Sequence, residues 1–371
     1  MSTSEVSGVA ELMDELRQGR MVVLMDDEHE THSQGVVMVA AEHCLDQHIT
    51  LMARRARGLV CLALTRERCE ELDLPPMVDR GDDDSARFTL SIEAAHGIDT
   101  GISAADRAHT VRVAVNPGAK PSDIVQPGHI FPLAAEPGGV LTRAGHTEAA
   151  VDYLRIAGLT PAAVVADILD REGELADGAA LEAFALEHGL KVGTIADLIN
   201  YRLTNERTIE RARDGELSTA HGVFRLTAYR DQTFGGIHLA LSLGELDEQT
   251  PVPVRVHFAS TFRDLLESEA PGTSGWSVQR SLERIARNGA GVLVLLSRHE
   301  NEENLLQSVD VALGATTPRE PRANDSYNTI GIGSQILRDQ GVAKLRLMGA
   351  PIKYNAISGF GLEVTDYLRP Q

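Results

Sequence analysis

The chain is poor in cysteine, and its few cysteines lie close together. Among 371 residues there are three, Cys44, Cys61 and Cys69, and none follows residue 69. An odd, sparse count gives no disulfide framework and is typical of proteins from a reducing compartment. The sequence also lacks any Cys-x-x-Cys pair, which excludes a zinc site of that kind.

Long apolar runs and an excess of positive charge are also missing. No run approaches the roughly 18 apolar residues that span a bilayer, which argues against a membrane protein. Residues 1–20 are acidic and amphipathic, unlike a signal or transit peptide, so we expect a cytoplasmic protein. Lysine and arginine total 35 against 54 acidic residues, and the formal net charge of −19 argues against nucleic acid and anionic membranes as partners.

The chain does have the length and composition of a two-domain globular protein. Its 371 residues exceed one typical core, and 43% of them are hydrophobic. Short apolar strands alternate with amphipathic helices, which favours an α+β fold with α/β layering. The best candidate boundary is 203–217, which lacks residues of the buried type. We expect strands over 21–25, 58–64, 87–95, 221–231, 236–246, 252–258, 291–297 and 344–349, and helices over 6–20, 66–74, within 101–115, and over 196–215, 277–289 and 330–341.

The densest group of site-like residues is 138–158, GGVLTRAGHTEAAVDYLRIAG. Its glycines permit tight turns, and apolar residues at helical spacing begin at Ala149. The backbone N–H groups of such a helix start, with Arg143 and the Thr147 hydroxyl, would form a phosphate cradle. The alternative is a plain helix start that Thr147 caps. That alternative leaves Arg143 and His146 unexplained.

Two other segments offer polar side chains. Residues 127–139, PGHIFPLAAEPGG, hold a single histidine, His129, in a segment stiffened by prolines. Residues 100–110, TGISAADRAHT, would orient substrate hydroxyls through Ser103, Asp106 and Thr110. The residues alone favour the other interpretation of this segment, which is a capped helix start.

A further segment, 25–38, reads MDDEHETHSQGVVM and follows an apolar strand. Carboxylates are the oxygen ligands that hard cations prefer. Histidines and valines interrupt the acidic pattern, so three interpretations stay open: a metal loop, an altered metal loop and a solvated turn. The carboxylates are those of Asp26, Asp27, Glu28 and Glu30.

These segments resemble a known enzyme family. The strings GLVCLAL, FTLSIEAAHGIDTGISAADR, AKPSDIVQPGHIFPL and GGVLTRAGHTEAAVD are similar to 3,4-dihydroxy-2-butanone 4-phosphate synthase, over most of residues 8–205. Further along, PVPVRVHF, IGIGSQILRDQGVAKLRLM and SGFGLEV resemble GTP cyclohydrolase II. The resemblance implies a synthase-like domain over 1–205 and a cyclohydrolase-like domain over 206–371, as in bifunctional proteins of riboflavin biosynthesis.

The synthase resemblance implies a lyase that converts ribulose 5-phosphate into formate and a four-carbon dihydroxybutanone phosphate. Magnesium or manganese is the implied cofactor, and a homodimer is implied because the family builds its pocket from two subunits. His146 takes the position of a metal ligand, and Asp167 that of a catalytic glutamate. The other implied roles are phosphate binding by Arg143, Gly145 and Thr147, and catalysis by Cys61, His129 and the loop carboxylates Glu28 and Glu30.

The acidic loop departs from the family pattern. Aligned on Gly35, the metal-binding glutamate becomes His32, the arginine before it becomes Thr31, and the closing aspartate becomes Val36. A pair formed by His32 and His146 would suit zinc or nickel better than magnesium. Val36 cannot accept a proton. We therefore expect either the family's reaction or a diverted one on ribulose 5-phosphate or a similar pentulose phosphate.

The second domain departs further. The first of the family's three zinc cysteines falls on Ser260, and the other two fall in 266–276, which contains no cysteine. An arginine expected to contact triphosphate is replaced by Glu303, whose charge would repel it. The sequence therefore predicts no zinc in the C-terminal domain and no GTP cyclohydrolase II activity.

Three functions remain as hypotheses. The first is an enzyme acting on a sugar phosphate, favoured because Arg143, His146 and His129 survive together. The alternative is a non-catalytic, ligand-binding or regulatory relative of the riboflavin enzymes, favoured by the changes in both domains. The third and weakest is a metal-binding protein that uses His29, His32 and His146.

Overall fold

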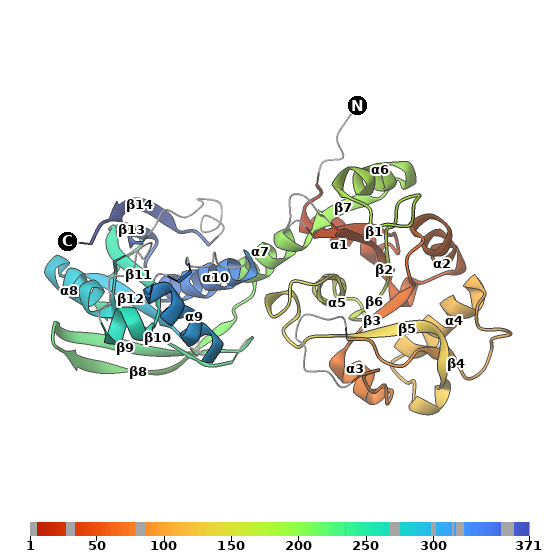
Figure 1. Cartoon of the computed structure of the whole chain (residues 1–371), viewed down its shortest axis with the longest axis horizontal. Helices are drawn as coiled ribbons and strands as arrows, with labels where there is room; N and C mark the ends of the chain where they lie inside the picture. The colour runs from red at the N-terminus through yellow and green to blue at the C-terminus, as the bar shows by residue number, and fades with distance from the viewer. Residues whose placement is uncertain are drawn as a thin grey trace. The chain divides into compact units, whose positions relative to one another are not determined.

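The computed structural model describes residues 6–26, 34–78, 87–233, 235–266, 275–297, 302–313, 315–316, 323–349 and 360–370. The chain divides into two compact units, Met1–Tyr201 and Arg202–Gln371, each built on a sheet flanked by helices (Figure 1). The expected class, α+β with α/β layering, is confirmed. No helix in these ranges combines the length and the apolar character that a bilayer crossing requires.

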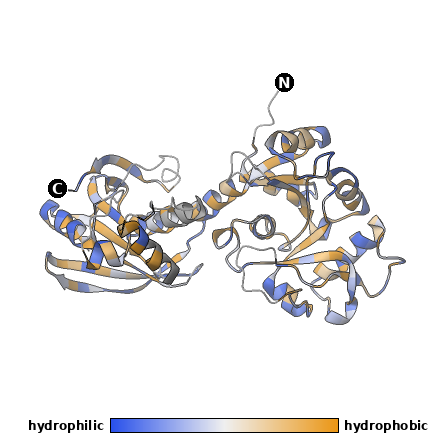
Figure 2. Cartoon of the chain, in the orientation of Figure 1, coloured by the Kyte–Doolittle hydropathy of each residue, from blue (hydrophilic) through white to orange (hydrophobic). Residues whose placement is uncertain are grey.

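Seven strands form the sheet of the first unit, in the order β4-β5-β3-β6-β2-β1-β7. The sheet is mixed, since β1 pairs antiparallel with β2 and parallel with β7. Its central strands are apolar runs buried on both faces, as a layer between helices requires (Figure 2). The bounds are β1 Val22–Asp26, β2 Gln34–Ala40, β3 Cys61–Thr65, β4 Ile92–Ala94, β5 Ile124–Ala135, β6 Ala162–Asp167 and β7 Lys191–Thr194.

Helices cover both faces of this sheet. Val23, Val37, Leu62 and Val164 point to one face and share a core with residues of α2, α4 and α6. The helices α1 and α5 pack together and against the central strands. The bounds are α1 Val9–Arg17, α2 Asp46–Leu51, α3 Arg66–Glu71, α4 Ala104–Val115, α5 His146–Ala157, α6 Gly178–His188 and α7 Ile195–Asn205.

A buried carboxylate shapes the loop that leads into α5. Asp152, within α5, accepts a hydrogen bond from the N–H of Val140 over 2.8 Å. Gly139 has φ +64° and lies against the same carboxylate, so a Cβ there would overlap it. Glycine is required at this position for both reasons. The Asp152 side chain of α5 therefore holds in place the turn that precedes residues 142–145.

The second unit also has a seven-stranded sheet, in the order β14-β13-β11-β12-β10-β9-β8. Residues of α10 join the core on one face, and residues of α8 join the core on the other. The bounds are β8 Ile209–Thr219, β9 Gly222–Asp231, β10 Ile237–Leu243, β11 Val252–Phe258, β12 Gly291–Leu296, β13 Lys344–Met348, β14 Glu363–Leu368, α8 Val278–Asn288, α9 Glu302–Ala312 and α10 Ala323–Asp339.

The helix expected over 196–215 is only half correct. The helix α7 ends at Asn205, and the charged residues that follow form β8, an edge strand paired antiparallel with β9. Arginine and glutamate favour helices only weakly, and here cross-strand partners decide the structure. Arg225 of β9, for example, donates to Asp214 of β8 over 2.7 Å. The charge pattern of a solvated helix and that of an exposed edge strand look alike in sequence.

Candidate active site

Four strands bring side chains to one end of the sheet in the first unit. β1 ends at Asp26, which pairs with Gln34 at the start of β2. β6 ends at Asp167, which pairs with Val36 of β2. β3 runs antiparallel to β6 and begins beside that end, at Cys61. Residues far apart in sequence therefore meet at one edge.

The register also selects one face of the sheet. Side chains alternate along a strand, and the neighbours of these residues fill the core shared with α2 and α4. The helix α5 begins over the opposite face, with His146. That face receives the other four side chains: Asp26, Val36, Cys61 and Asp167.

The imidazole of His146 lies at the centre of this group. Burial lowers the pKa of His146, while the nearby carboxylates of Asp26 and Asp167 act in the opposite direction. The backbone of Gln34 hydrogen-bonds the ring, whereas Nε2 is buried and has no hydrogen-bond partner among the described residues. Histidine ligands of metals commonly have one nitrogen fixed by a backbone group and the other open. The open Nε2 therefore makes His146 suitable as a metal ligand.

The acidic loop itself, with Glu28, His29, Glu30 and His32, lies outside the described residues. In the part of the chain that is described, no group of three or more histidine, cysteine, aspartate or glutamate side chains could hold a metal ion. The loop leaves the sheet after Asp26 and rejoins it at Gln34, and both residues interact with His146. Its two ends are therefore anchored beside the candidate ligand.

The N-terminus of α5 is open. Its N-cap residue is Gly145, and no side chain caps the helix, so the expected alternative of a Thr147 cap is wrong. Arg143 lies beside this helix start, with Nη1 3.6 Å from Oε1 of Glu148. First-turn N–H groups and a guanidinium together favour an anion such as a phosphate group.

Glu148 supports this loop from within. Its side chain is fully buried, and Oε1 accepts the N–H of Glu136 over 2.9 Å. Burial raises the pKa of Glu148, while the bond from Glu136 and the charge of Arg143 oppose that rise. Its other oxygen lies where a Cβ on Gly145 would be, so only glycine fits there. Nothing in the sequence pattern marked Glu148 as a support of this loop.

Nδ1 of His129, on β5, is hydrogen-bonded to the carboxylate of Glu93 on β4, a residue that the sequence did not mark as part of the site. His129 lies two residues before Phe131, which pairs with Cys61, so it belongs to the same region of the sheet. Its side chain is 43% exposed and can reach a substrate. Gly101 lies against the Glu93 carboxylate, where a Cβ would overlap it. This contact attaches the loop before α4 to His129.

The polar residues of 100–110 have local partners. Ser103 caps α4 by accepting the N–H of Asp106 over 3.0 Å, and Asp106 accepts the N–H of Gly101 over 3.0 Å. Thr110 is fully buried and accepts the N–H of Ala94 over 3.1 Å. These bonds support the capped helix start that the residues alone favoured, and they position the loop at Gly101.

Cys61 is not a thiolate. Burial, and secondly the charge of Asp167, raise the pKa of Cys61 to about 12. The thiol is therefore neutral near pH 7 and is neither an anionic nucleophile nor an anionic metal ligand. It can pack against substrate or donate a weak hydrogen bond.

In the second unit, an aspartate organises the end of β11. Asp264 accepts the N–H groups of Ser260 over 2.8 Å and of Val278 over 2.9 Å, and Nε2 of His257 over 2.8 Å. Arg255 donates to the other imidazole nitrogen over 3.2 Å. Burial lowers the pKa of His257, so the imidazole stays neutral between these partners. Segments 267–274 and 298–301 and the Glu303 side chain lie outside the described residues.

Both halves of the chain match known families. The model of 3,4-dihydroxy-2-butanone 4-phosphate synthase matches residues 10–201, and that of GTP cyclohydrolase II matches residues 210–369. A 3,4-dihydroxy-2-butanone 4-phosphate synthase of Pseudomonas aeruginosa is 50% identical over 361 residues, covering 97% of this chain and 98% of the relative. The riboflavin biosynthesis protein RibBA of Aquifex aeolicus is 44% identical, covering 96% of this chain and 91% of that protein.

Solved structures agree with this assignment. The crystal structure of RibBX, a two-domain 3,4-dihydroxy-2-butanone 4-phosphate synthase from A. baumannii, has a TM-score of 0.81 and 45% identity, covering 97% of this chain and 99% of that one. A synthase solved with two magnesium ions has a TM-score of 0.50 and 36% identity, covering 54% of this chain and 98% of that one. The chain therefore belongs to the 3,4-dihydroxy-2-butanone 4-phosphate synthase family, in the form that carries a GTP cyclohydrolase II domain after the synthase domain.

Proposed function

We propose that the first domain is a lyase of the 3,4-dihydroxy-2-butanone 4-phosphate synthase type, acting on ribulose 5-phosphate or a similar pentulose phosphate. The observation that carries this is the buried, unpartnered Nε2 of His146, with two carboxylates around the same ring. A scaffold without a ligand has no physical need for such an atom, because an unsatisfied buried nitrogen costs free energy.

Each residue of the site has a proposed task. The open start of α5, with Arg143 and Thr147, binds the substrate phosphate. His129, oriented by Glu93, exchanges protons with substrate hydroxyls. Asp167 lies near His146 on the same face of the sheet and is the proposed general base there.

A divalent cation would be held by His146 and by His32 of the acidic loop, whose carboxylates Glu28 and Glu30 are proposed to act in catalysis. The chemistry such a cation supplies is Lewis-acid stabilisation of negative charge on vicinal substrate oxygens. With His32 among the ligands, zinc or nickel should bind better than magnesium. We also propose a cytoplasmic homodimer, which light scattering on the full chain would test.

The proposal is tested by formate release. Purified protein is incubated with ribulose 5-phosphate and, in turn, with Mg²⁺, Mn²⁺, Zn²⁺ or Ni²⁺. We expect formate with at least one ion, and a higher rate with Mg²⁺ in the variant Thr31→Arg, His32→Glu, Val36→Asp, which restores the family's loop. If the wild type releases formate with Mg²⁺ as fast as this variant does, the interpretation of the loop as altered is wrong. If no pentulose phosphate is consumed with any ion, the enzymatic function is contradicted and the regulatory alternative remains.

For the second domain we propose no zinc and no GTP cyclohydrolase II activity. The observation behind this is Asp264, which already binds Ser260 and His257 at the end of β11 through its own carboxylate. We expect elemental analysis of the chelator-washed full chain to find no zinc that resists washing, and a GTP assay to find no ring opening. One tightly held zinc per chain, lost on changing Ser260→Ala, would refute this part of the proposal.

A further inference from the structure

One arginine close to the candidate active site has an unusual backbone conformation. Arg57 follows the helical segment 46–56 and has φ +66° and ψ −3°, in the left-handed region. Glycine usually occupies such a position, because a residue with a β-carbon is strained there. Asp73 is the other non-glycine residue with a positive φ in the described chain, and aspartate tolerates this region better than arginine does. Strained residues of this kind cluster at functional sites, where surrounding contacts hold them in place.

The side chain of Arg57 makes two contacts that depend on this conformation. Its Nη1 donates to the backbone oxygens of Leu169 over 3.0 Å and of Asp170 over 2.9 Å. These two residues follow the end of β6, which is Asp167. The backbone contributes as well, since the N–H of Leu169 donates to the oxygen of Ala56 over 2.8 Å. The segment just after Asp167 is therefore bound to the segment at Arg57 by main chain and side chain.

The residue after Arg57 allows the two segments to lie this close. A Cβ on Gly58 would lie 2.2 Å from the backbone oxygen of Asp167, so only glycine fits at this position. Arg57 itself forms an antiparallel bridge with Ile168. The glycine thus stands where the close approach requires it, and the arginine occupies the left-handed position beside it. This arrangement is explained if the arginine side chain has a task at that position.

The end of β6 has a second support on its other side. There the N–H of Ile168 donates to the backbone oxygen of Gly35, in β2, over 3.0 Å. The strand therefore ends between β2 and the contacts of Arg57, and both supports act within three residues of Asp167. The carboxylate of Asp167 lies near His146, on the face of the sheet where the candidate site is. The position of this carboxylate depends on how firmly the strand end is held.

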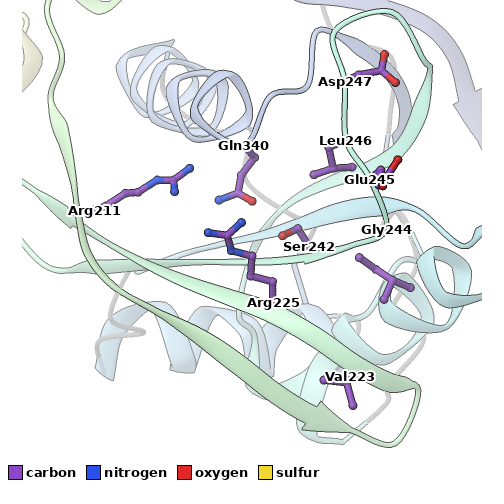
Figure 3. Close-up of a pocket in the computed structure, with 10 residues that line it drawn as sticks. Arg211, Val223, Arg225, Ser242, Gly244, Glu245, Leu246, Asp247 and Gln340 are labelled. Carbon is purple, nitrogen blue, oxygen red and sulfur yellow. The ribbon is translucent and has the colours of Figure 1, made fainter.

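The contacts of Arg57 differ in kind from those of the arginines that line the hollow of the second unit (Figure 3). There Arg211 donates to Asp339 over 2.5 Å and Arg225 donates to Asp214 over 2.7 Å, so carboxylates neutralise both charges. Arg57 has no carboxylate partner among the residues that the structure describes, and its bonds end on two successive backbone oxygens. Such bonds fix the course of a short segment and pair no charges.

We propose that Arg57 is a positioning residue of the lyase site, which holds the Asp167 carboxylate in place through the segment that follows β6. The inference rests on the proposed function, in which Asp167 is the general base. Arg57 acts through this segment and not on the substrate. Without its bonds, the substrate still binds, but proton transfer slows, because catalysis is sensitive to small misplacements of a base.

The test compares Arg57→Gly with Arg57→Lys in the full chain, by formate release from ribulose 5-phosphate with the metal ion that gives the wild type its highest rate. If only the backbone mattered at this position, glycine would be the best replacement, since it adopts a positive φ freely. We expect the opposite order. Arg57→Gly should lower kcat about tenfold and change KM less than about twofold, whereas Arg57→Lys, which keeps a donor, should retain at least about half of kcat.

The two ways of failing can be told apart. An active wild type with the same kcat as Arg57→Gly overturns the role of Arg57 and leaves the proposed function intact. An inactive wild type contradicts the proposed function, and this inference with it. The control is Arg171→Gln: Arg171 is exposed in the turn after β6, its side chain has no bond among the described residues, and the variant should keep the wild-type kcat.

Hydrogen exchange followed by mass spectrometry gives a readout that needs no turnover. In Arg57→Gly the peptide that covers 168–172 should exchange at least about threefold faster than in the wild type, while peptides from β2 should exchange at the wild-type rate. Faster exchange throughout the first unit would show a general structural role and would overturn the proposal. Unchanged exchange over 168–172 would overturn it as well.

A double-mutant cycle identifies the group through which Arg57 acts. Asp167→Asn removes the proposed base, so adding Arg57→Gly to this variant should lower its residual kcat by less than about twofold. A further tenfold loss in the double variant would mean that Arg57 supports a different group, and the proposal would then be wrong.

Discussion

Replacing His146 with glutamine should lower formate release from ribulose 5-phosphate by about a thousandfold, measured with the metal ion that gives the wild type its highest rate. Glutamine keeps a polar side chain of similar length. It removes the imidazole whose Nε2 is open and whose ring the Gln34 backbone fixes. The same variant should lose affinity for Mn²⁺, which calorimetry measures without turnover.

The control is His109→Gln. His109 lies on α4 and contacts the backbone oxygen of His96 over 3.0 Å, away from the candidate site. It should retain the wild-type rate. If His146→Gln were as active as this control, His146 would have no part in the reaction, and the proposed lyase site would have to be abandoned.

Replacing Asp264 with alanine should destabilise the C-terminal unit by about 3 kcal/mol. The carboxylate is 8% exposed and accepts bonds from two backbone N–H groups and from His257. Alanine fills none of these roles, and one buried and two partly buried donors lose their acceptor. Asp264→Asn should cost less, because its amide oxygen can still accept one of them.

Urea unfolding followed by tryptophan fluorescence isolates this effect. The chain has one tryptophan, Trp276, which is buried in the second unit, so the signal reports on that unit alone. Glu283→Ala is the matched control, since Glu283 is 44% exposed in an ion pair on α8, and a change within about 0.5 kcal/mol is expected. If Asp264→Ala and Glu283→Ala have the same urea midpoint of unfolding, then Asp264 does not stabilise the end of β11.

The sequence predicted local structure and the position of the helix start with more success than it predicted spatial neighbours. The strands expected over 21–25 and 58–64 correspond to β1 and β3, and the helix expected from Ala149 onward corresponds to α5, because buried apolar runs and glycines mark them. The convergence of Asp26 with Asp167 depends on the register of β2 between β1 and β6. Strand order is a tertiary property, and spacing along the chain does not contain it.

The misses have physical causes as well. Glu93 looked like one more polar residue of an alternating strand, and only its position opposite β5 makes it the partner of His129. Asp264 follows Arg263 in a segment with no turn or capping pattern, so nothing marked it as a buried acceptor. β8 was taken for helix because charged residues of both signs suit either exposed structure.

The parallel pairing of β1 with β7 has a consequence for biosynthesis. Val22 pairs with Lys191, roughly 170 residues later, so the sheet of the first unit lacks its last strand until nearly the whole unit has left the ribosome. Long-range parallel pairing of this kind slows folding, and β1 has a free edge until it occurs. Its sequence there, VVLMD, is apolar and β-branched. The nascent first unit should therefore depend on chaperones that shield this edge during translation, more than a unit of the same size built from local contacts would.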